Sequence, residues 1–285
     1  MDFELNEDQR MVQAAVREFA QAEIAPRARE YDEQEKFPRE QLNGLAEIGL
    51  LGMIIPEEYG GAGFDTVSYA VALEEIARAD SSVCVIVGVT NSVCCFPILS
   101  FGTEEQKQKY LVPLARGEKL GAFCLSEPQA GSDATNLRCR AEKDGDFYVL
   151  NGTKSWVTNG GEADVYLVMA GTGESDGKRE VTAFLVDRDA PGLAVSSIEH
   201  KMGQRASQTA EMSFTDCRVP ESNVLGKVGE GMKVALSSLD NGRVGIAALS
   251  VGIAQAALDE SLKYAKDRVA FGKPIAEFQA IQFKL

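Results

Sequence analysis

Apolar residues recur at helical spacing through roughly the first 120 residues of the chain. In the first such segment Val12, Val16 and Phe19 fall on one face, which is the pattern of an amphipathic helix. Pro26 has no backbone N–H to donate, so we expect it to interrupt that helix. Residues 1–120 are therefore predicted to form an α-helical N-terminal domain.

Three signals predict where helices of this domain begin. Asn6 and Gln9 have the spacing of a capping box, in which two side chains satisfy free backbone N–H groups. Thr103 and Gln106 repeat that spacing, and the helix that follows is predicted to reach about residue 117. Asp65 can cap a further helix by accepting a hydrogen bond from its first turn.

The pattern changes after Gly121, where short runs of β-prone residues replace the helical spacing. Four of these runs predict strands: Ala122–Leu125, Phe147–Leu150, Val165–Met169 and Val181–Val186. Asn151-Gly152 follows one of them and predicts a tight hairpin turn. We expect residues 121–228 to form an antiparallel sheet that closes into a small β-barrel.

Helical spacing returns at Gly231 and continues to about Arg268, before a turn at residues 271–274. Another helix is predicted to begin at Ile275 and to continue to Leu285 with no residue that would cap it. We expect residues 229–285 to start a C-terminal α-helical bundle that is incomplete. Helices, sheet and helices in successive blocks predict an α+β fold.

The chain is acidic, with 29 Lys and Arg against 43 Asp and Glu and a formal net charge of −14. This balance argues against nucleic acid or an anionic membrane as the main partner. The most apolar segment, residues 83–99, contains Pro97 and is shorter than the ~20 residues that a membrane span needs. We expect a buried core helix there and no membrane.

Cysteine and histidine narrow the chemistry further. The six cysteines form no CxxC pair and no secretory signal opens the chain, so we expect free thiols in a cytoplasmic protein. His200 is the only histidine and no GxSxG motif accompanies it. We therefore expect no metal site, no zinc enzyme and no ordinary serine hydrolase.

Five sequence blocks indicate more than composition does. They are PEEYGG (56–61), FGTEEQK (101–107), LSEPQAGSD (125–133), NGTKSWVTN (151–159) and RVAFGKP (268–274). In this order they resemble the acyl-CoA dehydrogenases, and the likeness extends over the whole chain. The details resemble most the short-chain, butyryl-CoA branch.

The resemblance implies FAD bound where the β-barrel meets the helical bundle, and it usually implies a homotetramer. The implied reaction is α,β-dehydrogenation of an acyl-CoA thioester to the trans-2-enoyl-CoA. A carboxylate removes the α-proton while the β-hydrogen leaves as hydride to the flavin. Electrons then pass to an electron-transferring flavoprotein.

The same resemblance implies which residues contact the flavin. One set falls in the predicted sheet: Phe123, Leu125, Ser126, Trp156, Val157 and Thr158. Trp156 would lie against one ring face, and Thr158 would place a hydroxyl near the flavin N5. Without the resemblance, the sequence predicts that Trp156 is a core aromatic residue and that Thr158 is an ordinary strand residue.

Three further cofactor contacts are implied near the C-terminus. Arg268 is suited to the FAD pyrophosphate and Phe271 follows it in the same block. Gln279 is implied to contact the FAD of a neighbouring subunit, so its role depends on the tetramer.

Three residues are implied to bind the coenzyme A substrate. Ser132 follows Gly131, which lets the backbone approach a ligand closely. Asp240 and Arg243 match the stretch that holds the adenine end of coenzyme A. The plain alternatives are a turn serine and an ion pair on a helix surface.

The catalytic base is not found among these residues. In some family members the Glu lies on the long helix, at the position that Gly242 occupies here. In most members it lies in a loop that would come after Leu285, where we therefore expect it. We expect this chain alone to be almost inactive.

Two other functions stay open. One is a non-catalytic flavin- or CoA-binding fragment or degenerate paralogue without the catalytic Glu. The other is an acyl-CoA oxidase that passes electrons to oxygen, which peroxide release would reveal.

Overall fold

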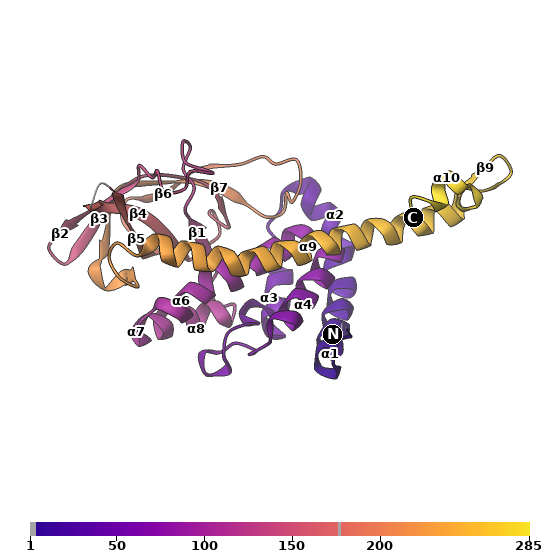
Figure 1. Cartoon of the computed structure of the whole chain (residues 1–285), viewed down its shortest axis with the longest axis horizontal. Helices are drawn as coiled ribbons and strands as arrows, with labels where there is room; N and C mark the ends of the chain where they lie inside the picture. The colour runs from indigo at the N-terminus through magenta and orange to yellow at the C-terminus, as the bar shows by residue number, and fades with distance from the viewer. Residues whose placement is uncertain (1–3, 176–177) are drawn as a thin grey trace.

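The computed structural model describes residues 4–175 and 178–285. The first part of the chain is helical, as predicted, and its helices gather below the sheet in Figure 1. These helical segments are α1 (Glu7–Phe19), η1 (Ala20–Ile24), α2 (Ala25–Gln34), α3 (Arg39–Glu47), η2 (Leu50–Gly52), η3 (Glu57–Tyr59), α4 (Thr66–Ala79), α5 (Ser81–Val89), η4 (Thr90–Cys95), α6 (Phe96–Phe101), α7 (Glu104–Gln106), η5 (Lys107–Leu111) and α8 (Val112–Ala115).

The three predicted helix starts are confirmed. Asn6 accepts from the Gln9 backbone N–H at 2.8 Å, and the Gln9 side chain accepts from the Asn6 N–H at 3.0 Å. Thr103 and Gln106 form a second complete capping box. Asp65 caps α4 by accepting from the backbone of its first turn at 2.7 Å.

The predicted interruption at Pro26 is wrong. The chain stays helical through η1, a π-helical turn, and passes directly into α2. Pro26 lies at one of the first two positions of α2, where a missing N–H costs no hydrogen bond of that helix.

The apolar segment after Asp80 is a continuous helical stretch, Ser81–Phe101, formed by α5, η4 and α6. Among the described residues it is the one helix long and apolar enough to cross a membrane by length and composition. Most of its apolar window is buried inside the protein, which is also the property of a core helix.

The middle part is one eight-stranded sheet in the order β6-β7-β3-β2-β4-β5-β8, with β1 also paired to β4. Its strands are β1 (Gly121–Cys124), β2 (Arg140–Asp144), β3 (Phe147–Thr158), β4 (Val165–Ser175), β5 (Lys178–Asp187), β6 (Leu193–Ile198), β7 (Thr209–Pro220) and β8 (Val224–Leu225). A short helix, η6 (Glu221–Asn223), precedes β8.

The predicted antiparallel barrel is wrong in two respects. The sheet is open, with β6 and β8 at the ends of its strand order. It is also mixed, because β1 and β2 both pair with β4 in parallel. Both strands reach β4 through long connections, and only strands joined by short turns are obliged to run antiparallel.

The hairpin predicted at Asn151-Gly152 is also wrong, because both residues lie inside β3. Gly152 lies at a register shift in the pairing of β3 with β7. A Cβ atom there would come within 2.6 Å of the Cys139 Cα, so glycine permits this close approach. The actual turn contains Gly145 (φ 59°), between the paired residues Asp144 and Phe147.

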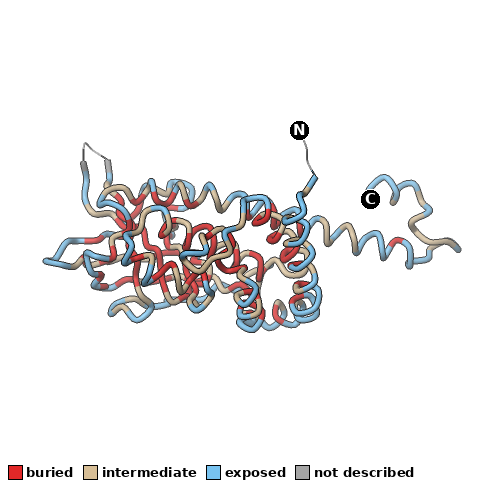
Figure 2. The backbone as a smooth tube through the Cα atoms, turned by 90° about the horizontal axis from the view of Figure 1, so that it is seen from below, coloured by how far each residue is buried: buried red, intermediate tan, exposed pale blue. Residues whose placement is uncertain are grey.

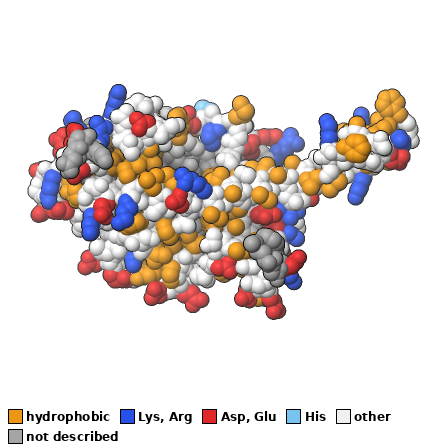
Figure 3. All heavy atoms as spheres, viewed as in Figure 1, with side chains coloured by type: hydrophobic (Ala, Val, Ile, Leu, Met, Phe, Trp, Pro, Cys, Tyr) orange, Lys and Arg blue, Asp and Glu red, His pale blue; other side chains and the backbone are white. Residues whose placement is uncertain are grey.

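The long helix α9 (Gly231–Asp267) is confirmed. It packs on α4, α5 and β5, and its last turns extend beyond the rest of the molecule (Figure 1). Figure 2 shows that this extension is mostly exposed, and Figure 3 shows hydrophobic side chains on its surface. A hairpin of β9 (Val269–Ala270) and β10 (Lys273–Pro274) follows, then η7 (Ile275–Glu277) and α10 (Gln279–Gln282), which is shorter than predicted.

Candidate functional site

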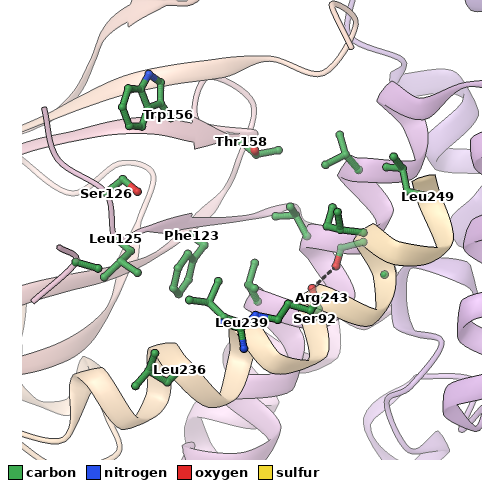
Figure 4. Close-up of a pocket in the computed structure, with 18 of the residues that line it drawn as sticks. Ser92, Phe123, Leu125, Ser126, Trp156, Thr158, Leu236, Leu239, Arg243 and Leu249 are labelled. Carbon is green, nitrogen blue, oxygen red and sulfur yellow. Dashed lines mark hydrogen bonds between the residues drawn. The ribbon is translucent and has the colours of Figure 1, made fainter. Parts of the chain in front are cut away.

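A cavity of about 680 Å³ lies between the sheet and two helical walls. One wall is β1 with the segment that follows it, together with the end of β3. The other walls are α5 with η4, and the first half of α9. In Figure 4, Phe123 and Leu125 face Leu236 and Leu239 of α9 across this space.

The β1 wall contains the predicted residues Phe123, Leu125 and Ser126, all of which line the cavity. Within the described chain, β1 has a ladder partner along one edge only, which is β4. The chain then turns away from β4, and the Ser155 N–H donates to the Ser126 carbonyl at 2.9 Å. This bond holds the wall next to β3.

Trp156 lines the cavity because β3 is irregular at this point. The pairing of β3 with β7 shifts between Lys154 and Val157, and Trp156 adopts a left-handed backbone conformation with φ 57°. That conformation is rare for a bulky residue and is typical of functional sites. The indole is 60% exposed, and Thr158 follows it on the same wall.

The loop between β1 and β2 completes this side of the cavity. Gly131 and Ser132 line it, and a Cβ atom on Gly131 would lie 3.6 Å from the Trp156 ring. The predicted substrate contact Ser132 therefore lies on the same cavity as the predicted flavin contacts.

Arg243 is the only charged residue among the described residues that line the cavity. It forms a short ion pair with Asp240, one turn earlier on α9, and both side chains are mostly exposed. Asp240 does not line the cavity. The ion pair matches the plain alternative given above, while Arg243 is also placed to meet a ligand.

Four predicted cofactor residues lie elsewhere. Val157 is buried in the sheet core, between its two lining neighbours. Arg268, Phe271 and Gln279 follow the end of α9, where all three are exposed and Phe271 is 97% exposed. A single chain does not bring these three to the cavity.

On the helical walls, the resemblance singled out only Gly242 and Arg243. The lining residues that were not predicted come mainly from α5, η4 and α9: Cys84, Val85, Gly88, Val89, Ser92, Val93, Leu236, Leu239, Gly245, Ile246 and Leu249. A usable signal was present in α9, because Leu239, Gly242, Ile246 and Leu249 recur at helical spacing on one face.

The part of the cavity lined by Leu73, Cys84 and Leu249 is apolar. Burial raises the pKa of the Cys84 thiol, with the Asp80 charge acting in the same direction, so the thiol stays protonated. Ser92 donates to the Gly88 carbonyl at 2.6 Å, which occupies its hydroxyl hydrogen within the helix (Figure 4). This end suits an apolar group.

The residues of the sheet side fit an isoalloxazine ring. Trp156 presents an exposed aromatic face, and Ser126 and Thr158 present hydroxyl groups to the same cavity. The second edge of β1 has no ladder partner in the described chain, and such an edge can offer backbone donors and acceptors.

Comparison with known proteins agrees with this geometry. Three family models match in chain order: acyl-CoA dehydrogenase N-terminal domain at residues 6–118, middle domain at 122–217 and C-terminal domain at 229–285. The chain belongs to the acyl-CoA dehydrogenase family, whose members are FAD-dependent oxidoreductases.

Two curated relatives are similar along the whole chain. The Bacillus subtilis protein named probable acyl-CoA dehydrogenase YngJ is 50% identical over 100% of this chain and 75% of its own length. The mitochondrial short-chain specific acyl-CoA dehydrogenase of Mus musculus is 48% identical over 99% of this chain and 68% of its own. The chain is thus shorter than these relatives.

Three solved structures share the fold. Butyryl-CoA dehydrogenase from Megasphaera elsdenii has a TM-score of 0.96 and 44% identity, covering 100% of this chain and 75% of that one. A glutaryl-CoA dehydrogenase from Mycobacterium smegmatis in complex with FADH2 gives 0.93 and 37%, covering 98% and 71%. A chain in a structure titled for the electron-transferring flavoprotein of Acidaminococcus fermentans gives 0.96 and 46%, covering 99% and 74%.

Proposed function

We propose that this chain forms the flavin and substrate site of a short-chain acyl-CoA dehydrogenase, which converts an acyl-CoA thioester to the trans-2-enoyl-CoA. The observation that carries the proposal is the meeting of Ser126, Ser132 and Trp156 on one cavity. These residues come from two separate sequence blocks, and only the fold brings them together.

FAD, when bound, supplies the hydride acceptor for this reaction. The residues of the chain bind and orient the reactants. The Trp156 ring offers a stacking face, while the hydroxyls of Ser126 and Thr158 offer hydrogen bonds on the same wall. Arg243 offers a guanidinium group, which suits a phosphate of coenzyme A.

The likeness to short-chain and butyryl-CoA dehydrogenases supports a short acyl group as the substrate. The cavity volume of about 680 Å³ must hold both the flavin ring and the acyl group. The end away from Trp156 is lined by Leu73, Cys84 and Leu249, which offer no charged partner to a dicarboxylic substrate. A purified, flavin-loaded protein that also contains the catalytic base, titrated with acyl-CoAs of increasing length, should lose flavin absorbance most readily with the short ones. Equal bleaching by long-chain substrates would contradict this choice.

The base that removes the α-proton is proposed to come from outside these 285 residues. No Asp, Glu or His is present among the described residues that line the cavity. Gly242 lines it, and a Cβ atom there would meet nothing nearer than 3.6 Å. Gly242→Glu should therefore place a carboxylate in the cavity and give substrate-dependent dye reduction. Gly242→Gln, of the same size but without a basic oxygen, is the matched control. Dye reduction at ordinary rates by the unchanged chain would refute the proposal.

The missing carboxylate also supports the second function left open, a flavin- or CoA-binding fragment without catalysis of its own. The two functions differ in one outcome. A dehydrogenase gains activity from Gly242→Glu, whereas a binding fragment with a degenerate site does not.

We further propose a homotetramer that passes electrons to an electron-transferring flavoprotein. The exposed positions of Arg268, Phe271 and Gln279 beyond α9 support an assembly in which they reach the flavin of another copy. The likeness to a chain in a structure titled for that flavoprotein supports the electron acceptor. A cytoplasmic location stays a prediction.

A further inference from the structure

A buried ion pair joins the two sequence blocks that form the sheet wall of the cavity. The Lys154 Nζ lies 2.7 Å from the Glu127 Oε1, and the two side chains are 0% and 1% exposed. Neither residue lines the cavity. Each is, however, a direct chain neighbour of the lining residues: Glu127 follows Ser126, and Lys154 precedes Ser155 and Trp156.

Within the described part of the chain, the Glu127 carboxylate accepts four hydrogen bonds. Besides Lys154, the Gln129 side chain donates at 2.7 Å, and the backbone N–H groups of Arg138 and Cys139 donate at 2.6 and 3.0 Å. The chain from Glu127 to Cys139 leaves the sheet and returns, and it carries Gly131 and Ser132. The carboxylate therefore closes the base of this loop.

Lys154, in β3, also connects the same carboxylate to the segment that follows β1. Its ammonium group donates to the Leu125 carbonyl at 3.0 Å, and the next residue donates from its backbone to the Ser126 carbonyl at 2.9 Å. Burial alone would raise the pKa of Glu127, but the charge and hydrogen bond of Lys154, with the other donors, lower it below its usual range. The Glu127 carboxyl group is therefore ionised in the folded protein at neutral pH.

A buried ion pair is not needed for stability as such, since well-packed apolar residues often serve as well. We propose that Lys154 and Glu127 are positioning residues, which fix the β1 end, the 127–139 loop and Trp156 in the arrangement that receives the flavin. The inference rests on the proposed function for the identity of the ligand. The positioning itself can be measured without any ligand.

Trp156 makes this measurement direct, because it is the only tryptophan of the chain. Its emission and its quenching by acrylamide report on one wall of the cavity. In Glu127→Gln and Lys154→Met the loop loses its anchor, so the Trp156 emission should shift to the red and acrylamide quenching should increase. FAD affinity, followed by quenching of the same emission, should fall about tenfold, because binding must then order the loosened wall.

The matched control is Glu75→Gln. Glu75 is a carboxylate of similar burial, 2% exposed, which pairs with Arg17 and Arg78 and lies away from the sheet. Its loss should lower the melting temperature and leave the Trp156 emission unchanged. An identical Trp156 response in the control would overturn the proposal.

The double variant Glu127→Gln/Lys154→Met decides the case in which a single variant fails to fold, because it leaves no unpaired buried charge. An altered Trp156 signal in a folded double variant supports positioning. A folded double variant with the Trp156 signal and the FAD affinity of the wild type overturns it. Failure of all three variants to fold also overturns it, because the ion pair would then be required for folding itself. If the wild type takes up no FAD while its emission still responds to the variants, the proposed function fails and the positioning role stands.

Discussion

Gly242 and Gly245 lie almost one turn apart on α9 and both line the cavity, yet only Gly245 is required by packing. A Cβ atom at Gly245 would lie 2.8 Å from the Tyr69 hydroxyl and 3.0 Å from Leu73. At Gly242 the nearest atoms, in Ser92 and Val93, are both 3.6 Å away. The absence of a side chain at Gly242 therefore leaves space for a ligand. At Gly245 the absence of a side chain allows α9 to lie close to α4.

This difference predicts opposite effects of one substitution. Gly242→Ala should raise stability by roughly 0.5–1 kcal/mol, because alanine is the better helix former. Gly245→Ala should lower it by about 1–3 kcal/mol, because the buried Tyr69 must move. Urea unfolding of the two variants measures both changes. Equal effects at the two positions would show that the contacts around α9 are wrong.

The six thiols should be unreactive in the folded protein. All six cysteines are buried and free. Burial raises the pKa of Cys124 to about 12 and that of Cys139 to about 11, so almost no reactive thiolate forms near pH 8. A thiol reagent should label none of them until denaturant is added and then label all. Rapid labelling of the native chain would contradict the burial of these cysteines.

Stability should fall in acid through Glu127. Because its pKa is lower in the folded chain than in the unfolded one, the unfolded state binds the proton more readily. The stabilisation is therefore complete above the unfolded pKa of about 4.3 and is lost as the pH falls through the lower, folded value. Unfolding measured between about pH 6 and pH 3 should show a weaker pH dependence in the double variant Glu127→Gln/Lys154→Met. The same slope in both proteins would exclude this contribution.

The exposed ion pair on α9 should separate stability from ligand binding. Asp240→Ala should change the free energy of unfolding by less than about 1 kcal/mol, because both partners are solvated. Arg243→Ala should cost as little in stability but should weaken coenzyme A binding, since Arg243 is the one charged residue among the described residues that line the cavity. Calorimetric titration with coenzyme A at low and high salt tests the second effect. An unchanged affinity for coenzyme A in Arg243→Ala would show that Arg243 does not contact the ligand.

Local signals predicted the helical parts of the fold well. The capping boxes at Asn6 and Thr103 and the long helix from Gly231 depend on neighbouring residues, which the sequence displays directly. The sheet depends on pairing between segments that are distant in the sequence, and for the sheet the local signals gave wrong predictions. Asn151-Gly152 is a hairpin signal, but long pairing of β3 with β7 on both sides of it keeps the strand extended.

One wall of the candidate site could be predicted from the sequence, whereas on the other wall only Gly242 and Arg243 were singled out, by the resemblance. Ser126, Ser132 and Trp156 occur in recognisable blocks, so they were found from the sequence. The helical wall arises where α5, η4 and α9 pack together, and its decisive feature at Gly242 is a missing side chain. A glycine that leaves space for a ligand and one that permits helix packing look the same in a sequence.

The most direct test of the central claim is a titration of the folded, flavin-free chain with FAD, followed by the fluorescence of Trp156. If the isoalloxazine ring binds against this side chain, the emission should be quenched strongly and should saturate at an equimolar amount of FAD. Folded protein whose Trp156 emission does not respond to FAD, and which stays colourless after gel filtration, would contradict the account.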